Sequence, residues 1–507
     1  PHKCACSAFF GRLRGFVAAG PITPIPPRSS FEKPGSLVEG PAFGAPRAAR
    51  PPAEWPAFRA DSLRSCATSS TVSAAPEVAW RQPLDSEWPD TLSTATEWRA
   101  LHHYYGRISA PVADQSNVYV ALPDDHQVVA LDAATGKTRW RFIAGGAVDS
   151  PPSLYGGAAY FGSRDGWLYA VDSQTGDLMW KRRISPVDTR VQIYGQLENR
   201  FPVRGAVTVR GGRVYATAGL HGMMGVMLCV ADAKTGDVIE YRQLPRGAYH
   251  NDVLVKDAGG SLFLGPLPLD LDAAAALLAA EQKKRRVHEP FHRVNSRALG
   301  TAKTVGHLLP LDSELLNTAK TTSPIGEPQV APIEQRRPTF LCYLHGQRAL
   351  NWTWNERVQI GIRSRTLMGW KRPEDARAEG KTLLSDLTGP VVSLSRETVD
   401  AHLQHELTVK RKSKDGPPQI EPLWQNQLGT VWLVALAGDR LILGGPMLES
   451  PHTDPLKAKG KLWVVDAEKG TRLAEVDLPR TPIQDGIAIA AGRVFCCLSD
   501  GSIVCLK

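Results

Sequence analysis

The sequence predicts an all-β fold built from repeated sheets of four strands, and three observations support this prediction. A short phrase returns after forty residues, as "ALDAATGKTRW" at Ala130–Trp140 and "AVDSQTGDLMW" at Ala170–Trp180. Apolar and β-branched runs of about four to six residues flank each phrase, as strands require. A repeat of this length cannot bury its apolar face alone, so it must pack against a copy of itself. Together these observations predict a β-propeller in which each copy is one blade.

Each copy carries the same turn between two of its strands. An aspartate stands four residues before a glycine, and the third copy is delayed by an insertion. The aspartate can accept hydrogen bonds from turn amides, and the glycine can take the positive φ that the turn needs. We therefore assign a structural role to these pairs: Asp132 with Gly136, Asp172 with Gly176, Asp232 with Gly236, and Asp466 with Gly470.

The phrase A-x-D-x-x-T-G-x-x-x-W resembles the tryptophan-docking motif of pyrroloquinoline-quinone (PQQ) repeat propellers. That group includes quinoprotein alcohol dehydrogenases and the outer-membrane assembly lipoprotein propeller. The resemblance covers roughly residues 53–255 and 420–507. It implies that Trp140 and Trp180 dock between neighbouring blades, since one hairpin cannot cover so large an apolar surface. Seven or eight four-stranded blades both fit the sequence, and the resemblance implies eight. It also implies an exported, periplasmic location. Two copies depart from the motif, with Glu240 and Ala474 where the tryptophan would stand.

The two chain ends are predicted to share a sheet. In the family that the motif resembles, a strand from the N-terminal end completes the final blade, an arrangement called velcro closure. The last copy here, "GRVFCCLSDGSIVCLK", stops after its third strand, while "EVAWRQPL" at Glu77–Leu84 is an orphan strand that carries Trp80. We expect Val78–Gln82 to pair beside Ser502–Leu506, which leaves no free sheet edge there.

Two further regions frame the repeats. Residues 1–52 are rich in Pro, Ala, Gly and Arg, which predicts a poorly ordered leader or linker before a propeller over 53–507. An irregular insertion is expected at about 270–340, with a surface helix over Ala273–Arg286 that an aspartate caps. The strands of the missing blades must come from residues 250–420.

Composition excludes several classes of function. The net charge is +9, but Lys and Arg are scattered and not interleaved with aromatic residues, which disfavours a nucleic-acid platform. The sequence has no run of eighteen apolar residues, so it predicts no transmembrane helix. Zinc and haem sites are disfavoured, because the eight cysteines form no C-x-x-C pair and no group with His at zinc spacing. The histidine sets, such as His288 with His292, are interpreted as surface residues.

Three readings are open for the C-terminal cysteines. They can be free thiols in the blade core. A two-residue turn at Asp500–Gly501 would make Cys496 face Cys505, within the range of a disulfide. The third reading comes from the resemblance to quinoprotein alcohol dehydrogenases, which implies a vicinal disulfide between Cys496 and Cys497 beside a cofactor. In that family, however, the adjacent cysteines lie in an early blade.

Charged residues recur at one position of the innermost strands. Aligning the copies brings Asp149, Arg204 and Asp485 to this position. The innermost strands of a propeller line its central channel, so these three residues are candidate cofactor-binding residues at the channel mouth, for calcium, a quinone carboxylate or a substrate. The alternative is that they bind water and loop amides in a solvated channel. No catalytic residue is assigned, because no stretch matches the calcium site, the aspartate base or the arginine of a quinone enzyme.

The function expected from these features is that of a binding or interaction scaffold in the cell envelope. We expect a monomer that takes a protein or small-molecule ligand at the channel mouth and needs no cofactor. The alternatives are a PQQ- and calcium-dependent dehydrogenase of alcohols or sugars, and a surface that binds polyanions.

Overall fold

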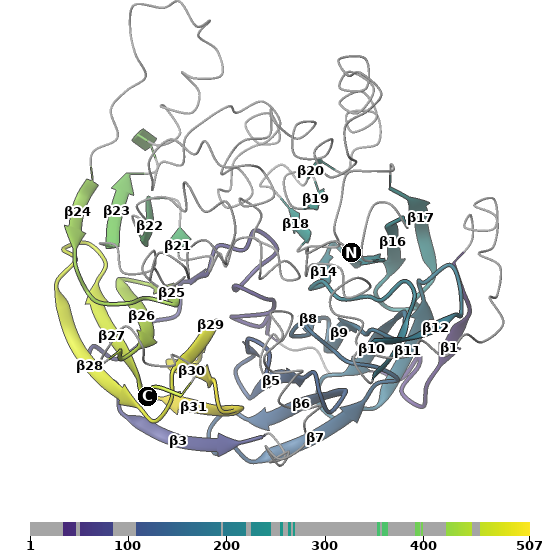
Figure 1. Ribbon diagram of the computed structural model, residues 1–507, viewed down its shortest axis with the longest axis horizontal. Coiled ribbons are helices and arrows are strands. Elements are labelled where there is room, and N and C mark those ends of the chain that lie inside the picture. Colours follow the sequence, from purple (N-terminus) through teal and green to yellow (C-terminus); the bar gives the residue numbers. More distant parts are fainter. Residues whose placement is uncertain are drawn as a thin grey trace, which may run out of the picture.

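The computed structural model shows short β-strands arranged in small sheets around a common centre (Figure 1). It describes residues 34–46, 51–84, 108–193, 196–219, 225–244, 254–256, 262–264, 267–268, 352–354, 357–362, 391–395, 397–398, 422–448 and 457–507. Over these residues the predicted all-β propeller fold is confirmed. The predicted helix Ala273–Arg286, the insertion at 270–340 and His288 with His292 lie outside them.

Three sheets in the first half are antiparallel meanders that follow the order of the chain. The first strand of each lies nearest the centre and the fourth lies towards the outside (Figure 1). The first sheet holds β4 (Val112–Ala113), β5 (Asn117–Leu122), β6 (Gln127–Asp132) and β7 (Thr138–Ile143). The second holds β8 (Ser153–Tyr155), β9 (Ala158–Gly162), β10 (Trp167–Asp172) and β11 (Leu178–Arg183). The third holds β14 (Thr208–Arg210), β15 (Arg213–Ala218), β16 (Met227–Asp232) and β17 (Val238–Gln243).

The second half adds three more sheets before the final one. A three-stranded sheet holds β18 (Leu254–Lys256), β19 (Leu262–Leu264) and β20 (Leu267–Pro268). The next holds β21 (Trp352–Trp354), β22 (Val358–Ile362), β23 (Val391–Ser395) and β24 (Pro422–Asn426). The third holds β25 (Leu433–Ala437), β26 (Arg440–Pro446), β27 (Gly460–Asp466) and β28 (Arg472–Leu478). A separate hairpin of β12 (Arg190–Ile193) and β13 (Gln196–Asn199) lies between β11 and β14 in the chain.

The final sheet joins both parts of the chain, as the sequence predicted. Its strands are β29 (Pro482–Ala490), β30 (Arg493–Leu498), β31 (Ser502–Leu506) and β3 (Val78–Pro83). β3 pairs antiparallel with β31, with Trp80 opposite Cys505, and Figure 1 shows the purple strand beside the yellow ones. The described residues thus form seven blade-like sheets. Eight blades and closure of the whole ring stay predictions, since 269–351 lie outside the described part.

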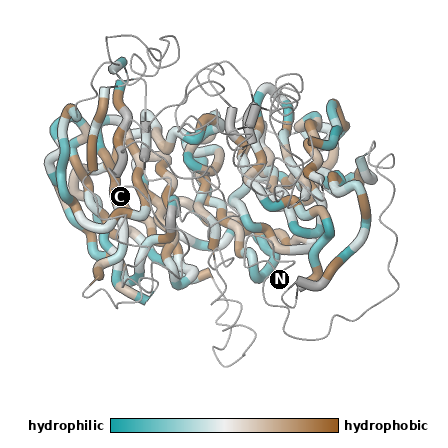
Figure 2. The backbone as a smooth tube through the Cα atoms, turned by 45° about the horizontal axis from the view of Figure 1, so that its top comes forward, coloured by the Kyte–Doolittle hydropathy of each residue, from teal (hydrophilic) through white to brown (hydrophobic). Residues whose placement is uncertain are grey.

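Burial explains the residue pattern of the strands. Middle strands such as β5 and β9 are buried along their whole length, because each lies between two neighbouring sheets. Outer strands such as β7 and β28 alternate between exposed and covered residues. Figure 2 accordingly shows hydrophobic stretches within the sheets and hydrophilic stretches towards turns and outer strands.

Tryptophans join consecutive sheets through the repeated turn. Trp140 donates from its indole nitrogen to the Ser173 carbonyl at 3.1 Å, and Trp180 donates in the same way to Ala233 at 3.2 Å. Each ring lies against the turn glycine of the next sheet, Gly176 or Gly236, so closely that a Cβ there would meet it at 2.7 Å. These glycines have φ of +78° and +72°. Glycine is therefore required both by the backbone and by the tryptophan.

Two more tryptophans dock in the same way. Trp80 of β3 donates to the Ala133 carbonyl beside Gly136, and Trp424 of β24 donates to the Ala467 carbonyl beside Gly470. The turn aspartates organise all four turns, because each carboxylate accepts backbone N–H bonds from the second and the third residue after it: Asp132, Asp172, Asp232 and Asp466. The motif therefore pairs a tryptophan with the turn of the following sheet.

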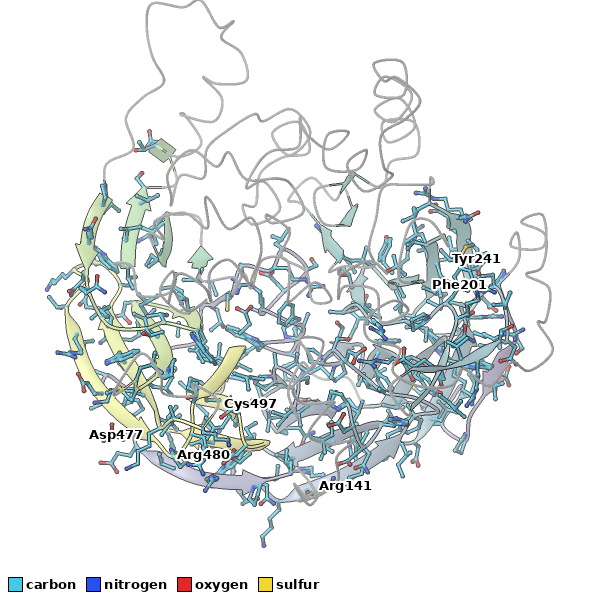
Figure 3. The ribbon with its side chains drawn as sticks, viewed as in Figure 1. Arg141, Phe201, Tyr241, Asp477, Arg480 and Cys497 are labelled. Atoms are coloured by element: carbon cyan, nitrogen blue, oxygen red, sulfur yellow. The ribbon has the colours of Figure 1, made fainter. Side chains whose placement is uncertain are left out.

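The C-terminal hairpin differs from its predicted register. Cys496 pairs with Val504, and Phe495 pairs with Cys505, because the loop has three residues with Gly501 at φ +80° instead of two. The shift of one residue places the Cys496 and Cys505 side chains on opposite faces of the sheet, so the alternative in which these two cysteines face one another is wrong. The described cysteines are all free and buried: Cys66, Cys229, Cys496, Cys497 and Cys505. Figure 3 shows Cys497 within the ring, whereas Arg141 lies on the outer strand β7.

Part of the predicted leader is an ordered strand. β1 (Leu37–Glu39) pairs antiparallel with β11 at the outer edge of its sheet. Further backbone bonds extend the contact, from Gly35 N to Arg183 O and from Gly40 N to Met179 O. Leu37 packs beside Trp180 and Gly236, which gives this segment an apolar anchor. For residues 34–46 the expectation of a poorly ordered leader is therefore wrong.

Candidate functional site

The centre of the propeller is filled by residues 54–68 of the chain itself, which we call the central segment. Figure 1 shows it as the purple trace that runs between the innermost strands. Trp55 exchanges backbone hydrogen bonds with Ala113 of β4, and the Pro56 carbonyl accepts from Leu154 of β8. The segment ends as β2 (Ala67–Thr68), which pairs parallel with β25. Trp55 has no exposed surface and Cys66 has 1%.

Arg64 fixes the central segment to two further sheets. Its guanidinium donates to Thr208 Oγ1 of β14 at 2.9 Å and to the Leu254 carbonyl of β18 at 2.8 Å. It also donates to the carbonyl of Phe58 within the segment at 2.9 Å. Burial lowers the pKa of Arg64 to about 10, partly offset by the nearby carboxylate of Asp61. The group remains a cation at neutral pH and is held almost entirely by neutral oxygen atoms.

The last turn of the segment reaches β21 and β25. Thr353 of β21 donates from its hydroxyl to the Cys66 carbonyl at 2.7 Å, and Leu436 of β25 donates to the same carbonyl. Asp61 closes the preceding loop, since its carboxylate accepts from the Ser65 hydroxyl at 2.6 Å. Four residues that are not glycine have positive φ in this stretch: Arg59, Ala60, Arg64 and Cys66. Left-handed backbone is costly for such residues, so the surrounding contacts must hold the segment in this shape.

Arg59 completes the set of contacts by reaching the final sheet. Its guanidinium forms a buried ion pair with Asp485 of β29, where the two side chains are 1% and 9% exposed. Arg59 also donates from Nε to the Arg64 carbonyl at 3.3 Å. Asp485 has a positive φ of 52°, an uncommon conformation for this residue. The central segment thus contacts the innermost strand of each of the seven blade-like sheets in the described part of the chain: β4, β8, β14, β18, β21, β25 and β29.

A second buried group of charges lies beside β8 and β14. Arg164, in the turn between β9 and β10, donates to both carboxylate oxygens of Asp149 at 2.7 and 2.6 Å. It also donates to Glu198 of β13 at 2.6 Å. Arg204 donates to the other oxygen of Glu198 at 2.5 Å and lies 3.9 Å from Asp149. Two arginines and two carboxylates make this cluster formally neutral, and bidentate Arg pairs are the strong form of such contacts.

The charges of this cluster stabilise one another. Burial by itself raises the pKa of Glu198, but Arg164 and Arg204 hold that pKa below its usual value. Burial likewise lowers the pKa of Arg164, and the carboxylates of Asp149 and Glu198 outweigh it and raise that pKa. Arg164 and Glu198 therefore stabilise each other's charged forms, and each of the four groups has an opposite charge within reach.

The structure separates the three channel-mouth candidates. Asp149 and Arg204 belong to the neutral cluster, whereas Asp485 is paired with Arg59 of the central segment. Sequence reasoning missed Arg59, Arg164 and Glu198. Glu198 enters the interior only because the inserted β12–β13 hairpin carries it there. No repeat position predicts that hairpin.

The described residues do not fit PQQ with calcium. Asp149, Arg204 and Asp485 already have charged partners from this chain, and the central segment occupies the space between the innermost strands. Among the described residues, no three His, Cys, Asp or Glu side chains gather as metal ligands. The chain's own residues 54–68 are thus the occupant of the centre.

Parts of the chain are similar in sequence to known proteins. Residues 70–265 match the family model described as "Outer membrane protein assembly factor BamB". The dehydrogenase subunit of the quinone alcohol dehydrogenase of Gluconobacter oxydans (strain 621H) is 28% identical over 167 residues, which are 28% of this chain and 21% of that protein. The corresponding subunit of Gluconacetobacter polyoxogenes is 32% identical over 122 residues, 22% of this chain and 16% of that protein. The chain therefore spans about a fifth of the length of these curated relatives.

Solved structures of the same kind are similar in outline. A quinohemoprotein alcohol dehydrogenase from Pseudomonas putida HK5 aligns with a TM-score of 0.49 at 13% identity, covering 90% of this chain and 80% of that chain. BamB from Moraxella catarrhalis aligns with a TM-score of 0.30 at 12% identity, covering 77% and 79%. In the part of the chain that the structure describes, no helix is long and apolar enough to cross a bilayer. The repeats and the sheets show a β-propeller fold, and residues 70–265 are similar to PQQ-repeat propellers.

Proposed function

We propose that this PQQ-repeat propeller is a binding scaffold of the cell envelope and not a quinone-dependent dehydrogenase. The observation that carries the proposal is the central segment. A propeller enzyme needs an accessible centre in which cofactor and substrate meet, and here Trp55, Arg59 and Arg64 fill that space with 0 to 3% exposure. A scaffold needs only a rigid ring, which the docked tryptophans supply.

The buried charges support the same conclusion. An enzyme prepares charged groups whose partners appear only when substrate or cofactor binds, because preorganised charge stabilises the reaction. In this chain the carboxylate of Asp485 is paired with Arg59, and Asp149 is paired with Arg164. These pairs stabilise the folded protein but leave little charge to act on a bound molecule.

The envelope location is also part of the proposal. It is supported by the matching family model, whose description names an assembly factor of the outer membrane. Expression of the tagged protein from its natural coding sequence, followed by cell fractionation, tests this location. Recovery in the envelope fractions is expected, and recovery only with cytosolic markers would contradict it.

The alternative of a PQQ- and calcium-dependent dehydrogenase is favoured by the curated relatives, which are named as dehydrogenase subunits of quinone alcohol dehydrogenases. One assay separates the two functions. The purified chain is incubated with PQQ and calcium and then desalted. The bound quinone is measured by absorbance, and dye reduction is measured with a panel of alcohols and sugars. The dehydrogenase subunit of Gluconobacter oxydans serves as positive control. We expect neither stoichiometric quinone nor dye reduction, and one quinone per chain would overturn the proposal.

A further inference from the structure

The central segment is held as a bound peptide is held, which suggests a ligand for the scaffold. We propose that the centre of the propeller is a binding site for a looped peptide whose two ends pair with inner strands and whose loop carries two arginines five residues apart, and that residues 54–68 occupy this site in cis. This inference rests on the proposed scaffold function and names the class of partner. The chain continues on both sides of the segment through exposed residues, at Pro51–Pro52 and at Ser73–Ala75.

Main-chain pairing provides the first element of recognition. β2 adds to the inner edge of β25 in parallel, and among the described strands every other pairing is antiparallel. Addition of a strand to a sheet edge is a common way to bind an extended peptide, because it needs no particular side chains. The backbone pairing of Trp55 with Ala113 fixes the other end of the segment in the same manner.

Arg59 provides the first specific contact. Its cationic group reaches a carboxylate that belongs to a different sheet and lies 426 positions away in the chain. Removal of the segment would leave Asp485 as a buried anion facing the centre without this cation. A charge of that kind favours a guanidinium, which is planar, always protonated and weakly hydrated. The carboxylate is therefore the part of the site that selects arginine at this position.

Arg64 provides the second specific contact. Its donors meet the Leu254 carbonyl at 3.2 and 2.8 Å and the Thr208 hydroxyl at 2.9 Å. Both acceptors lie on innermost strands of neighbouring sheets, so a guanidinium at this point bridges them. Phe58 covers the same guanidinium, with 5.9 Å between Cζ and the ring centroid. This contact lies within the segment and helps to hold the Arg64 guanidinium where it meets the two strands.

The segment fits this site imperfectly, which permits exchange with a competing peptide. The indole N–H of Trp55 is buried without a hydrogen-bond partner. Four residues that are not glycine hold left-handed backbone, at φ between 54° and 75°. A peptide that forms the two arginine contacts with relaxed backbone would compete with the tethered segment.

The test releases the segment from its tether in the full-length chain. A specific protease site is inserted at Pro51–Pro52 and a second at Ser73–Ala75, and both are cut in the folded protein. A fluorescent synthetic peptide of residues 54–68 is then added, and anisotropy reports its binding while mass spectrometry reports release of the excised fragment. We expect one labelled peptide per chain after both cuts and none in the uncut protein.

Matched peptides separate specific recognition from simple occupancy. A peptide with R59E places a carboxylate against Asp485, and we expect it to bind at least about thirtyfold more weakly. A peptide with D61N retains both arginines and is the control for a changed charge at a neighbouring position. The variant Asp485→Asn should lose most of the discrimination between the native and R59E peptides.

Three outcomes would overturn the inference. The first is that the excised fragment remains bound without exchange over hours. The second is that the doubly cut protein loses its native circular dichroism. The third is that the R59E peptide binds as tightly as the native peptide. Each of the first two would make the segment permanent core. None of these results concerns the quinone assay, so the scaffold function could survive them, whereas quinone uptake by the uncut chain would remove the scaffold function directly.

Discussion

The docked tryptophans lead to a prediction that separates backbone strain from packing between blades. Gly176 and Gly156 both have positive φ, at +78° and +58°. A Cβ at Gly156 would meet no atom within 4 Å, whereas a Cβ at Gly176 would lie 2.7 Å from the ring of Trp140. The substitutions Gly176→Ala and Gly156→Ala therefore share the backbone cost, and only the first disturbs the docking.

The expected magnitudes follow from these contacts. Placing alanine in left-handed backbone costs roughly 1–2 kcal/mol, which is the whole effect expected at Gly156. At Gly176 the ring of Trp140 must also move, since unbonded carbon atoms pack at about 3.5–4.0 Å. Overpacking typically costs about 1–3 kcal/mol, and loss of the bond to Ser173 about 1 kcal/mol more. We expect Gly176→Ala to lose roughly 3–6 kcal/mol of unfolding free energy.

Urea unfolding measures this difference. Both variants and the parent are unfolded while tryptophan fluorescence and far-ultraviolet circular dichroism are recorded, and the transition midpoints are compared. Movement of Trp140 from its buried position should also shift its emission to the red in folded Gly176→Ala, but not in Gly156→Ala. Equal losses of stability in the two variants would refute the role given to the docked ring.

Three further predictions concern the buried polar groups. Because the folded pKa of Glu198 is depressed, its stabilising contribution is present above the usual glutamate value of about 4.3 and is lost as pH falls through the lower folded value. Glu198→Gln should cost about 3 kcal/mol at pH 7 and flatten the acid limb of a plot of unfolding free energy against pH; an unchanged limb would contradict this. Burial raises the pKa values of the Cys66 and Cys505 thiols to about 12, so both should resist iodoacetamide at pH 8 in the folded protein and react fully in denaturant, as mass spectrometry would show. Trp424→Phe removes the indole donor to Ala467 and should lower stability by about 1 kcal/mol, measured by urea unfolding; no loss would mean that the bond is dispensable.

Local repetition made much of the architecture predictable. The aspartate and glycine of each turn interact with residues close by in the chain, so their pattern in the sequence determines their structure. Trp80 and the strand around it were predictable because the last repeat lacks a strand. Trp424 was missed because the motif was sought within one copy, whereas the tryptophan docks on the turn of the copy that follows. A tryptophan upstream of each aspartate turn is the signal that would have found it.

The same pairing explains one of the departures from the motif. Ala474 stands on β28, and the sheet that follows β28 in the chain is the final one. The last two strands of that sheet, β31 and β3, are joined by pairing and not by a turn. No turn glycine is present there to receive a tryptophan, so a small residue at this position costs nothing.

Long-range contacts made the candidate site unpredictable. Arg59 and Arg64 look like surface residues in the sequence, since nothing near them is periodic or strongly apolar. Their burial depends on Asp485 and Leu254, far away in the chain. The alternative pairing of Cys496 with Cys505 was wrong for a simpler reason. One additional loop residue moves every side chain of the following strand to the other face of the sheet.

The placement of β1, the central segment and β3 has a consequence for how the protein is made. All three pieces precede in the chain the strands that they pair with, and β3 must wait for β31, which lies far downstream. During synthesis the Trp80 strand therefore stays unpartnered until β31 has been made, a state that invites aggregation and calls for chaperones. Loss of β31 alone would leave β3 without its pairing partner, so the folding of an early segment depends on a late one.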